Sequence, residues 1–187
     1  MYIIENEIIE RNEGNEFTGM KVRIADRANV PEVSKVLALS WKSEMSGIVY
    51  DEYLTTIRED RWIEPLMNGL DEGLSFISIL ESDEGIQGVA VLRHLDEEGT
   101  VNLVAFYLLP ERIGKGYGSI FFDLLEIELH SRGYKKCVLD VLEGNNRAIR
   151  FYEKKGFVVT GKTEMVPLGD VDYLCIEYGK ELKSIFD

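Results

Sequence analysis

The sequence predicts a mixed α/β fold of the α+β kind, a single domain built around a mostly antiparallel sheet of six or seven strands. Two observations predict it. Short segments that alternate apolar and polar residues are interleaved with segments whose apolar residues recur every three or four positions, typical of strands and amphipathic helices. In addition, three strand-like segments follow one another in mid-chain, and a strand–helix–strand unit, which pairs its strands in parallel, comes next.

The beginning of the chain is set apart by its acidity, with five glutamates and one arginine in the first 19 residues. We therefore expect an acidic N-terminal extension over residues 1–19 and one domain over residues 20–187. The first nine residues, MYIIENEII, could add an extra strand, and residues 10–19 read as a linker.

The domain is predicted to open with a strand over residues 20–25, MKVRIA, because apolar and charged residues alternate there. Residues 26–45 are predicted to form a helix with one apolar face. The residues of that face are Val30, Val33, Val36, Leu37 and Trp41. Residues 49–69 form a second helical region, which we expect to be closed by Pro65 and Gly69.

The rest of the chain is rich in strand patterns. The predicted strands are residues 74–80, 85–95, 101–109, 135–142, 157–163 and 171–182. The first two form a hairpin around the acidic turn ESDE, and the last two form another. Helices are predicted over residues 119–133 and 145–157, with Gly133 and Gly156 at their C-terminal ends.

Composition excludes several classes of protein. The net charge is −13 and no concentrated basic face is present, so we expect no nucleic-acid partner. The apolar runs are too short to span a membrane and the first residues lack a signal-peptide pattern, so we expect a cytoplasmic protein.

Cys137 and Cys175 lie in apolar strands and are expected to be reduced and buried. His94 and His130 stand alone, so no metal site is expected. The acidity suits a cationic partner, although solubility alone would also explain it.

Three glycines at every second position, Gly114, Gly116 and Gly118, lie between a predicted strand and a predicted helix in PERIGKGYGS, residues 110–119. Such a junction offers unpaired backbone N–H groups and the positive end of a helix dipole, which together bind anions. The amides from Gly114 to Ser119 could surround a pyrophosphate, with Arg112 and Lys115 adding positive charge. A tight turn without a ligand is the alternative.

Two common phosphate-binding motifs do not fit this segment. A P-loop would need Ser or Thr after its lysine, and Gly116 follows Lys115. A dinucleotide fingerprint would need Gly-x-Gly-x-x-Gly after an early strand, and the spacing here is Gly-x-Gly-x-Gly.

The segment VLEGNNRAIRFYEKKGF lies just downstream and contains the pattern Asn-x-x-Ala-x-x-Phe-Tyr-x-x-x-Gly-Phe. Its residues are Asn145, Ala148, Phe151, Tyr152, Gly156 and Phe157. Together with the glycine segment it strongly resembles the GNAT family, whose members transfer acetyl from acetyl-coenzyme A to amines. The resemblance covers residues 20–182. It implies helices on both faces of the sheet, two central parallel strands that splay apart, and acetyl-CoA as co-substrate.

The resemblance also implies roles for particular residues. The backbone of Phe106, Tyr107 and Leu108 would bond the pantetheine arm, Asn145 would hydrogen-bond the same arm, and Tyr152 would be the general acid that protonates the leaving thiolate. The pyrophosphate would be bound by the loop of Arg112, Ile113, Gly114, Lys115, Gly116, Tyr117, Gly118 and Ser119.

The sequence departs from the family pattern at two positions. Ile113 stands where the family has Gln or Arg, so Arg112 or Lys115 would have to supply a side-chain contact, if one exists. Asn102 stands where the family often has a glutamate base, and asparagine cannot take a proton at neutral pH. The identity of the general base is therefore undecided. It could be another carboxylate or a chain of waters, or no base is needed because the amine arrives neutral. Arg147, with Arg150 and Lys154, could face the ribose phosphate or form a solvated basic face.

The acceptor side is predicted from the first two helical regions, which usually line the acceptor pocket in this family. They carry the aromatic residues Trp41, Tyr50, Tyr53 and Trp62 and the carboxylates Glu44, Asp51 and Glu52. Such a set suits an alkyl ammonium group, although these aromatics could be core. We expect a small cationic amine such as a polyamine as acceptor. A protein or peptide N-acetyltransferase, a non-catalytic acyl-CoA-binding regulator and an unrelated phosphate binder are the alternatives. The resemblance is compatible with a homodimer.

Overall fold

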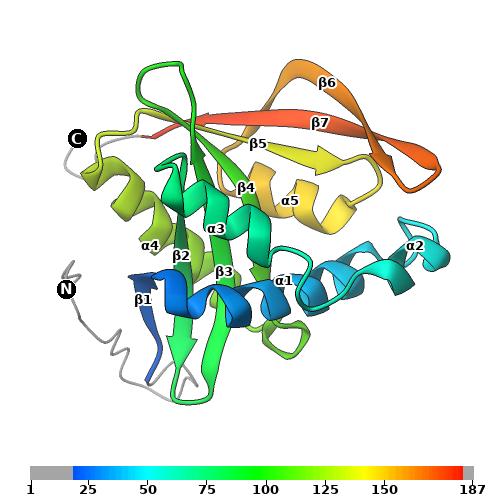
Figure 1. The fold of residues 1–187 in the computed structure, drawn as a ribbon. Helices are drawn as coiled ribbons and strands as arrows, with labels where there is room; N and C mark the ends of the chain where they lie inside the picture. Colours follow the sequence, from blue (N-terminus) through cyan, green and yellow to red (C-terminus); the bar gives the residue numbers. More distant parts are fainter. Residues whose placement is uncertain (1–18, 183–187) are drawn as a thin grey trace.

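The computed structural model describes residues 19–182, which form a seven-stranded sheet flanked by helices (Figure 1). The predicted acidic extension, apart from Gly19, and its extra strand lie outside the described residues. The strands are β1 (Lys21–Ile24), β2 (Ser75–Ser82), β3 (Gly85–His94), β4 (Thr100–Leu108), β5 (Lys136–Leu142), β6 (Val158–Leu168) and β7 (Val171–Glu181). They form one sheet in the order β1-β2-β3-β4-β5-β7-β6. The predicted mixed fold is thus confirmed.

Helices cover both faces of the sheet, as expected. They are α1 (Val30–Met45), α2 (Asp51–Thr56), α3 (Ile63–Asp71), α4 (Tyr117–Ser131) and α5 (Asn146–Lys154), with 3-10 turns at Arg27–Asn29 and Pro110–Arg112. The buried faces of α1 and α3 pack on β2, β3 and β4, whereas α4 and α5 pack on the opposite face (Figure 1). The glycine segment joins β4 to α4, and α5 follows β5.

The second helical region differs from the prediction. It is divided into α2 and α3 by residues 57–62, and neither Pro65 nor Gly69 ends a helix. Pro65 instead lies in the first turn of α3, where the missing N–H has no helical acceptor to lose. The two C-terminal glycines are confirmed: Gly133 and Gly156 follow α4 and α5 with φ of 87° and 88°, a conformation that glycine adopts without strain.

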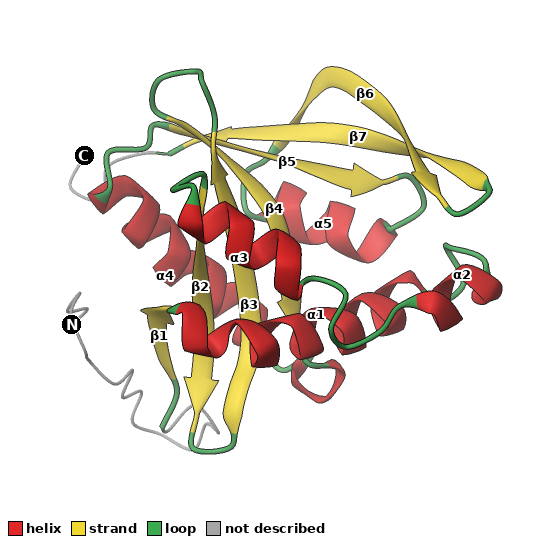
Figure 2. Ribbon diagram, in the orientation of Figure 1, coloured by secondary structure: helices red, strands yellow, loops and turns green. Residues whose placement is uncertain are grey.

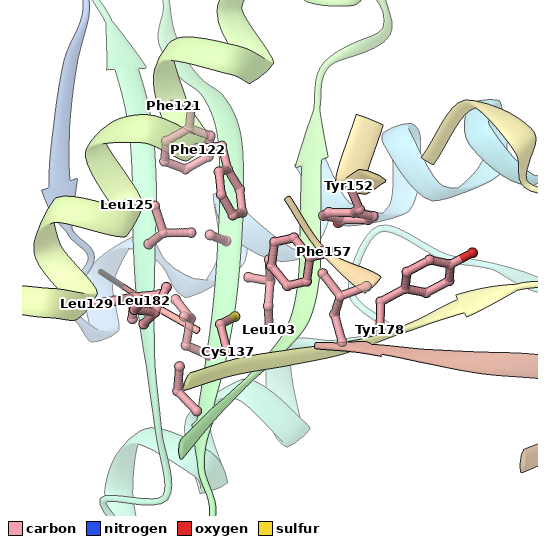
Figure 3. Packing of buried hydrophobic residues seen from close by; sticks show 14 of the residues in the cluster. Leu103, Phe121, Phe122, Leu125, Leu129, Cys137, Tyr152, Phe157, Tyr178 and Leu182 are labelled. Carbon is pink, nitrogen blue, oxygen red and sulfur yellow. The ribbon is translucent and has the colours of Figure 1, made fainter. Parts of the chain in front are cut away.

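The core between the sheet and α4 is aromatic and aliphatic. Phe121, Phe122 and Leu125 of α4 are fully buried and point toward the strands, as Figure 3 shows, and Phe157 packs against them. Cys137 lies in the same cluster, and burial raises the pKa of its thiol to about 12. Both cysteines are buried and free, as predicted.

The sheet contains one parallel pair, β4 with β5, and that pair is short. It joins Thr100, Val101 and Asn102 to residues 136–138, after which the two strands diverge (Figure 2). On its other side β4 stays paired with β3 as far as Leu108. The predicted splaying of the central strands is therefore confirmed.

Beyond Asn102, β4 and β5 separate, and the opening between them is called the fork below. A β-bulge in β4 lies where this fork begins. Val91 of β3 pairs with Ala105 and Leu92 pairs with Leu103, so Val104 has no partner on β3. A bulge bends the strand and reverses which residues face each side of the sheet. Beyond it, Phe106 and Leu108 face α4 and α5, and Ala105 and Tyr107 face α1 and α3.

Candidate active site

A cavity of about 610 Å³ occupies the fork between β4 and β5. Its walls come from the glycine segment, from α1 and α5, and from β4, β5, β6 and β7. It therefore runs from the α5 side of the sheet, through the opening between the strands, to the α1 side. A cavity of this size can bury a large part of an extended cofactor.

The glycine segment forms one end of this cavity. Gly114 and Gly116 have φ of 77° and 90°, and Gly116 is the N-terminal cap of α4. A Cβ added at Gly114 would meet no atom within 4 Å, so the backbone there is open to the cavity. Within the described chain, the amides of Gly114 and Gly118 donate to no acceptor. The junction thus has the geometry and polarity of an anion site.

The cavity contains most of the residues predicted to bind the cofactor. Those that line it are Phe106, Tyr107, Leu108, Ile113, Gly114, Gly116, Gly118, Ser119 and Asn145. The other three do not line it. Arg112 donates to Gln87 Oε1 at 2.7 Å and pairs with Glu84, Lys115 is exposed, and Tyr117 is buried beneath the Arg112 guanidinium. The Arg112 side chain therefore points away from the cavity, and Lys115 is outside its lining.

The edge of β4 that faces the fork is free of a partner strand beyond Asn102. Phe106, Tyr107 and Leu108 are hydrogen-bonded to β3 on one side, and their outward-facing peptide groups on the other side border the cavity. An extended ligand with amide groups could pair with this edge as a strand would. Asn102 itself has a buried Oδ1 without a hydrogen-bond partner in the described chain.

Tyr152 lies on α5 and lines the cavity from the α4 and α5 side. Only 9% of its surface is exposed, and its ring packs edge-to-face against Phe151 and Phe157. Its hydroxyl has no hydrogen-bond partner among the residues described. Burial raises the pKa of Tyr152 well above its ordinary value, so the phenol stays protonated at neutral pH.

Asn145 is the N-terminal cap of α5, and its Oδ1 accepts a hydrogen bond from Ala148 N at 3.1 Å. This contact gives the asparagine a structural role that is independent of any ligand. Its side-chain amide nitrogen has no partner within residues 19–182 and borders the cavity. Lys155, at the other end of α5, donates to Ser119 Oγ at 2.7 Å and so fixes α5 to the first turn of α4.

Two of the residues predicted for the acceptor side lie at the cavity. Trp41 and Glu44 of α1 line the cavity, and Glu44 accepts a hydrogen bond from Arg147 of α5 at 3.1 Å. The hydrogen bond between Arg147 and Glu44 therefore connects the α5 wall of the cavity with the α1 wall. Asp51 and Glu52 are exposed on α2 and lie outside the cavity lining.

The remaining acceptor-side aromatics form a cluster beside Trp41. Tyr53 lies 6.0 Å from it and Trp62 lies 6.5 Å from it, measured between ring centroids. The Arg61 guanidinium stacks over Tyr53 and Trp62, which shows that these rings accept a cation. Tyr50 packs against Tyr53, and its hydroxyl accepts a hydrogen bond from Asp170 N.

A second, smaller cavity of about 190 Å³ adjoins the first under α1 and α3. The two share Trp41, Val104, Ala105 and Tyr107 in their walls. The far end of the smaller cavity is bounded by Trp62. An acceptor with a long chain thus has room beyond the fork.

Some cavity residues were not predicted. Asp140 of β5, Val166 and Leu168 of β6 and Cys175 of β7 all line the cavity from the α1 side. One signal was present for Asp140, a charged residue in the middle of the apolar strand KKCVLDVL. The contribution of β6 and β7 had no such signal, because it depends on how the last hairpin folds over the fork.

Comparison with known proteins identifies the family of this chain. Residues 37–157 match the model of the acetyltransferase (GNAT) family. The match covers more than half of the chain, so the chain belongs to this family. It is accordingly an N-acetyltransferase, and it uses acetyl-CoA as its co-substrate. Comparison with curated protein sequences finds no significant match.

Solved structures show the same fold. A PaiA N-acetyltransferase from Thermoplasma acidophilum, in complex with coenzyme A, is 24% identical with a TM-score of 0.71, over 88% of this chain and 99% of that chain. A spermidine N-acetyltransferase SpeG chimera from Vibrio cholerae is 15% identical with a TM-score of 0.68, over 88% and 97%. The ribosomal-protein-S18-alanine N-acetyltransferase from Escherichia coli is 15% identical with a TM-score of 0.68, over 88% and 95%.

Within residues 19–182, every helix is too short or too polar to cross a lipid bilayer. The same part of the chain holds no cluster of three or more His, Cys, Asp or Glu side chains that could bind a metal ion.

Proposed function

We propose that this enzyme transfers the acetyl group of acetyl-CoA to a small cationic primary amine, such as a polyamine, by direct attack of the amine on the thioester. One observation carries the proposal. A single cavity joins the glycine segment, the unpaired edge of β4, the hydroxyl of Tyr152 and the aromatic and acidic side chains of α1.

The backbone is proposed to hold the cofactor. The amides between Gly114 and Ser119 bind the pyrophosphate at the N-terminus of α4, where the helix dipole adds to their attraction. Phe106, Tyr107 and Leu108 pair with the pantetheine amides along the free edge of β4. The amide nitrogen of Asn145 reaches the same arm from the start of α5. With the cofactor bound in this way, the proposed position of the thioester is in the fork, next to Tyr152.

The chemistry then follows from the groups around the thioester. The nitrogen lone pair of the amine forms a bond to the carbonyl carbon, and a backbone N–H of β4 stabilises the negative charge on the oxygen. The carbon–sulfur bond breaks and its electrons leave with the sulfur. Tyr152, kept neutral by its buried position, gives its proton to that sulfur. The acceptor arrives as an ammonium ion, so its nitrogen loses two protons. One goes to a base or to solvent before the attack, and the other goes to the tyrosinate after it, which restores the phenol.

The acceptor class is inferred from the opposite wall. Trp41 borders the cavity next to rings that already hold a guanidinium, and Glu44 adds a carboxylate. A spermidine acetyltransferase with the same fold is consistent with a cationic acceptor. A peptide N-terminus is the second candidate, since a structure of similar fold acetylates the alanine of a ribosomal protein.

The test is thiol release from acetyl-CoA over a panel of polyamines, monoamines, amino acids, aminoglycosides and peptides. We expect polyamines to give the highest kcat/KM. A clear preference for peptides would replace this proposal with the second candidate. Silence over the whole panel, with tight acetyl-CoA binding in calorimetry, would indicate a non-catalytic regulator.

Location and assembly are part of the same proposal. The two buried, free cysteines are typical of a reducing compartment, so we infer a cytoplasmic enzyme. The resemblance to the family suggests a homodimer, which sedimentation of the full chain would test.

A further inference from the structure

Asp140 is a charged residue between two buried neighbours in β5. Leu139 and Val141 face the core formed with α4 and α5. Because successive side chains of a strand point to opposite faces, Asp140 points to the α1 side of the sheet. It lies two residues beyond Val138, the last residue of β5 that pairs with β4, and it lines the large cavity. Its carboxylate thus borders the fork on the acceptor side.

The opposite wall of the same cavity carries Tyr152, on the α5 side of the sheet. Its side chain is more than nine-tenths buried, and its hydroxyl has no hydrogen-bond partner among the described residues. The fork therefore has a carboxylate on one side and an unpartnered phenol on the other. A proton acceptor near the amine and a proton donor near the sulfur would both accelerate a direct acyl transfer.

The surroundings of Asp140 favour proton binding. The residue is exposed, but neighbouring groups displace part of the water around its carboxylate. This desolvation raises its pKa, and the charges of Glu177 and Glu164 raise it further, while Lys162 lowers it. Glu177 is the cross-strand partner of Asp140 on β7, but its carboxylate already accepts from Thr160 Oγ1 at 2.7 Å and lies 3.4 Å from Lys162. Of these carboxylates, Asp140 is the one that lines the cavity.

Other titratable or charged groups border the cavity from the elements packed around it. Glu44 of α1 is paired with Arg147 of α5. Tyr107 of β4 and Cys175 of β7 are kept neutral by burial, which raises the pKa of each. The cavity is thus lined by two carboxylates, Glu44 and Asp140. In the described part of the chain, Glu44 has an ion-pair partner and Asp140 has none.

We propose that Asp140 binds the ammonium group of the acceptor in the fork and removes a proton from it. This inference rests on the proposed function. One N–H bond of the ammonium breaks and its proton goes to a carboxylate oxygen of Asp140, which leaves the nitrogen lone pair free to attack the thioester carbon. The carbon–sulfur bond breaks, and the sulfur takes the proton of Tyr152. The second N–H proton returns to Tyr152, and Asp140 releases its proton to solvent.

The experiment compares Asp140→Asn with Glu143→Gln, using spermidine and acetyl-CoA. Glu143 is exposed just after β5 and outside the cavity lining, so its variant controls for the loss of one negative charge. We expect Asp140→Asn to lower kcat/KM about 100-fold or more near neutral pH, the size expected for a lost base. The difference in kcat/KM between Asp140→Asn and the wild type should become smaller as pH rises, because more of the amine is already neutral. Glu143→Gln should behave as the wild type, and the acetyl-CoA affinity should be unchanged in both.

The pH profile gives a second readout. Asp140 acts when ionised, so wild-type kcat/KM should fall as pH drops through its pKa. This acid limb should move to lower pH in Glu164→Gln, which removes a negative charge beside it. An Asp140→Asn variant that keeps the wild-type rate and acid limb would overturn the inference.

A third measurement separates this inference from the proposed function. If the wild type acetylates none of the amines tested, the proposed function fails. The Asp140 carboxyl can then be titrated by carbon NMR in the coenzyme A complex, with and without spermidine. A pKa above the ordinary aspartate value that falls when spermidine is added supports the ammonium site. A pKa at or below the ordinary value, unaffected by spermidine, overturns it.

Discussion

The hydroxyl of Tyr152 is the one polar atom of a side chain otherwise packed among aromatic rings. Phe151 and Phe157 pack edge-to-face against the ring, and the residue lines the cavity. Because burial raises its pKa, ionised tyrosine is unfavourable in the resting enzyme. The residue is therefore suited to give a proton only when a stronger base, such as a departing thiolate, forms beside it.

Replacing Tyr152 with phenylalanine should lower kcat at least tenfold, which corresponds to about 1.4 kcal/mol of barrier. The ring packing is kept, so the affinity for acetyl-CoA should change little. Thiol release and calorimetry measure the two quantities. Tyr178→Phe is the matched control, because it removes a hydroxyl from the same core outside the cavity lining. An unchanged kcat in Tyr152→Phe would exclude this tyrosine as the acid.

Single residues were predicted best where the motif depends on the backbone. The glycines of the loop could be placed from their spacing, since their torsion requirement appears directly in the sequence. Asn145 was predicted only from the resemblance to the family motif, and its role as the cap of α5 was not predicted. The direction of Arg112 could not be predicted. Arg112 turns toward Glu84 and Gln87, and this contact between β3 and the loop exists only once the sheet has formed.

At the scale of elements, the first turn of α4 is the part proposed to bind the phosphates of the cofactor. Gly118 lies in that turn and borders the cavity, and a Cβ there would meet Leu108 at 3.4 Å, an ordinary contact. Gly116 is less useful as a test position, because any side chain at a φ of 90° strains the backbone.

Gly118→Asp should therefore separate binding from folding. A carboxylate in the first turn of a helix interacts favourably with the helix dipole, by about 0.3–1 kcal/mol, so the melting temperature should not fall below that of Gly118→Ala. The same charge should repel the pyrophosphate and raise the Kd for coenzyme A at least tenfold relative to Gly118→Ala. Equal affinities in the two variants would mean that this turn does not bind the phosphates.

The pairing of β1 with β2 gives a stability prediction. Glu81 accepts hydrogen bonds from Arg23 Nε and Nη2 at 2.8 and 2.9 Å, and these bonds lower its pKa from 4.5 to about 2. A pKa lowered by folding means that the contribution to stability is complete above pH 4.5 and is lost as pH falls toward 2.

We therefore expect Glu81→Gln to lower the free energy of unfolding at neutral pH, with a difference from wild type that disappears near pH 2. Urea denaturation over a pH series measures this. A constant difference at all pH values would show that the glutamine disturbs packing rather than charge.

Element prediction succeeded for β1 to β5, for β7 and for α1, α4 and α5, whose apolar periodicity is clear. The strand predicted over residues 157–163 was too short, because β6 runs to Leu168. It failed between residues 49 and 69, where one helical region proved to be two helices. The break at residues 57–62 contains no glycine or proline, and it is held by contacts with α1, such as Ser34 Oγ to the carbonyl of Glu59 at 2.6 Å. A contact between distant segments of this kind leaves no local pattern.

For the whole molecule, the net charge of −13 should attract cationic substrates. Salt screens such attraction, since the Debye length is about 10 Å at 0.1 M ionic strength. We expect the KM for spermidine to rise with sodium chloride concentration, more steeply than the KM for a monoamine. Steady-state kinetics with hydroxylamine, which is neutral at pH 7, gives the control. A salt-independent KM for spermidine would mean that the charge serves solubility alone.

The shortness of the β4–β5 pair has a consequence for how the protein unfolds. Three residue pairs connect a four-stranded part of the sheet, β1 to β4, with a three-stranded part formed by β5, β7 and β6. Without ligand, the backbone amides of the two parts should exchange their hydrogens for deuterium at separate rates. A cofactor hydrogen-bonded to the free edge of β4 and in contact with α5 would link the two parts of the sheet. With the cofactor bound, their amides should therefore exchange at similar rates.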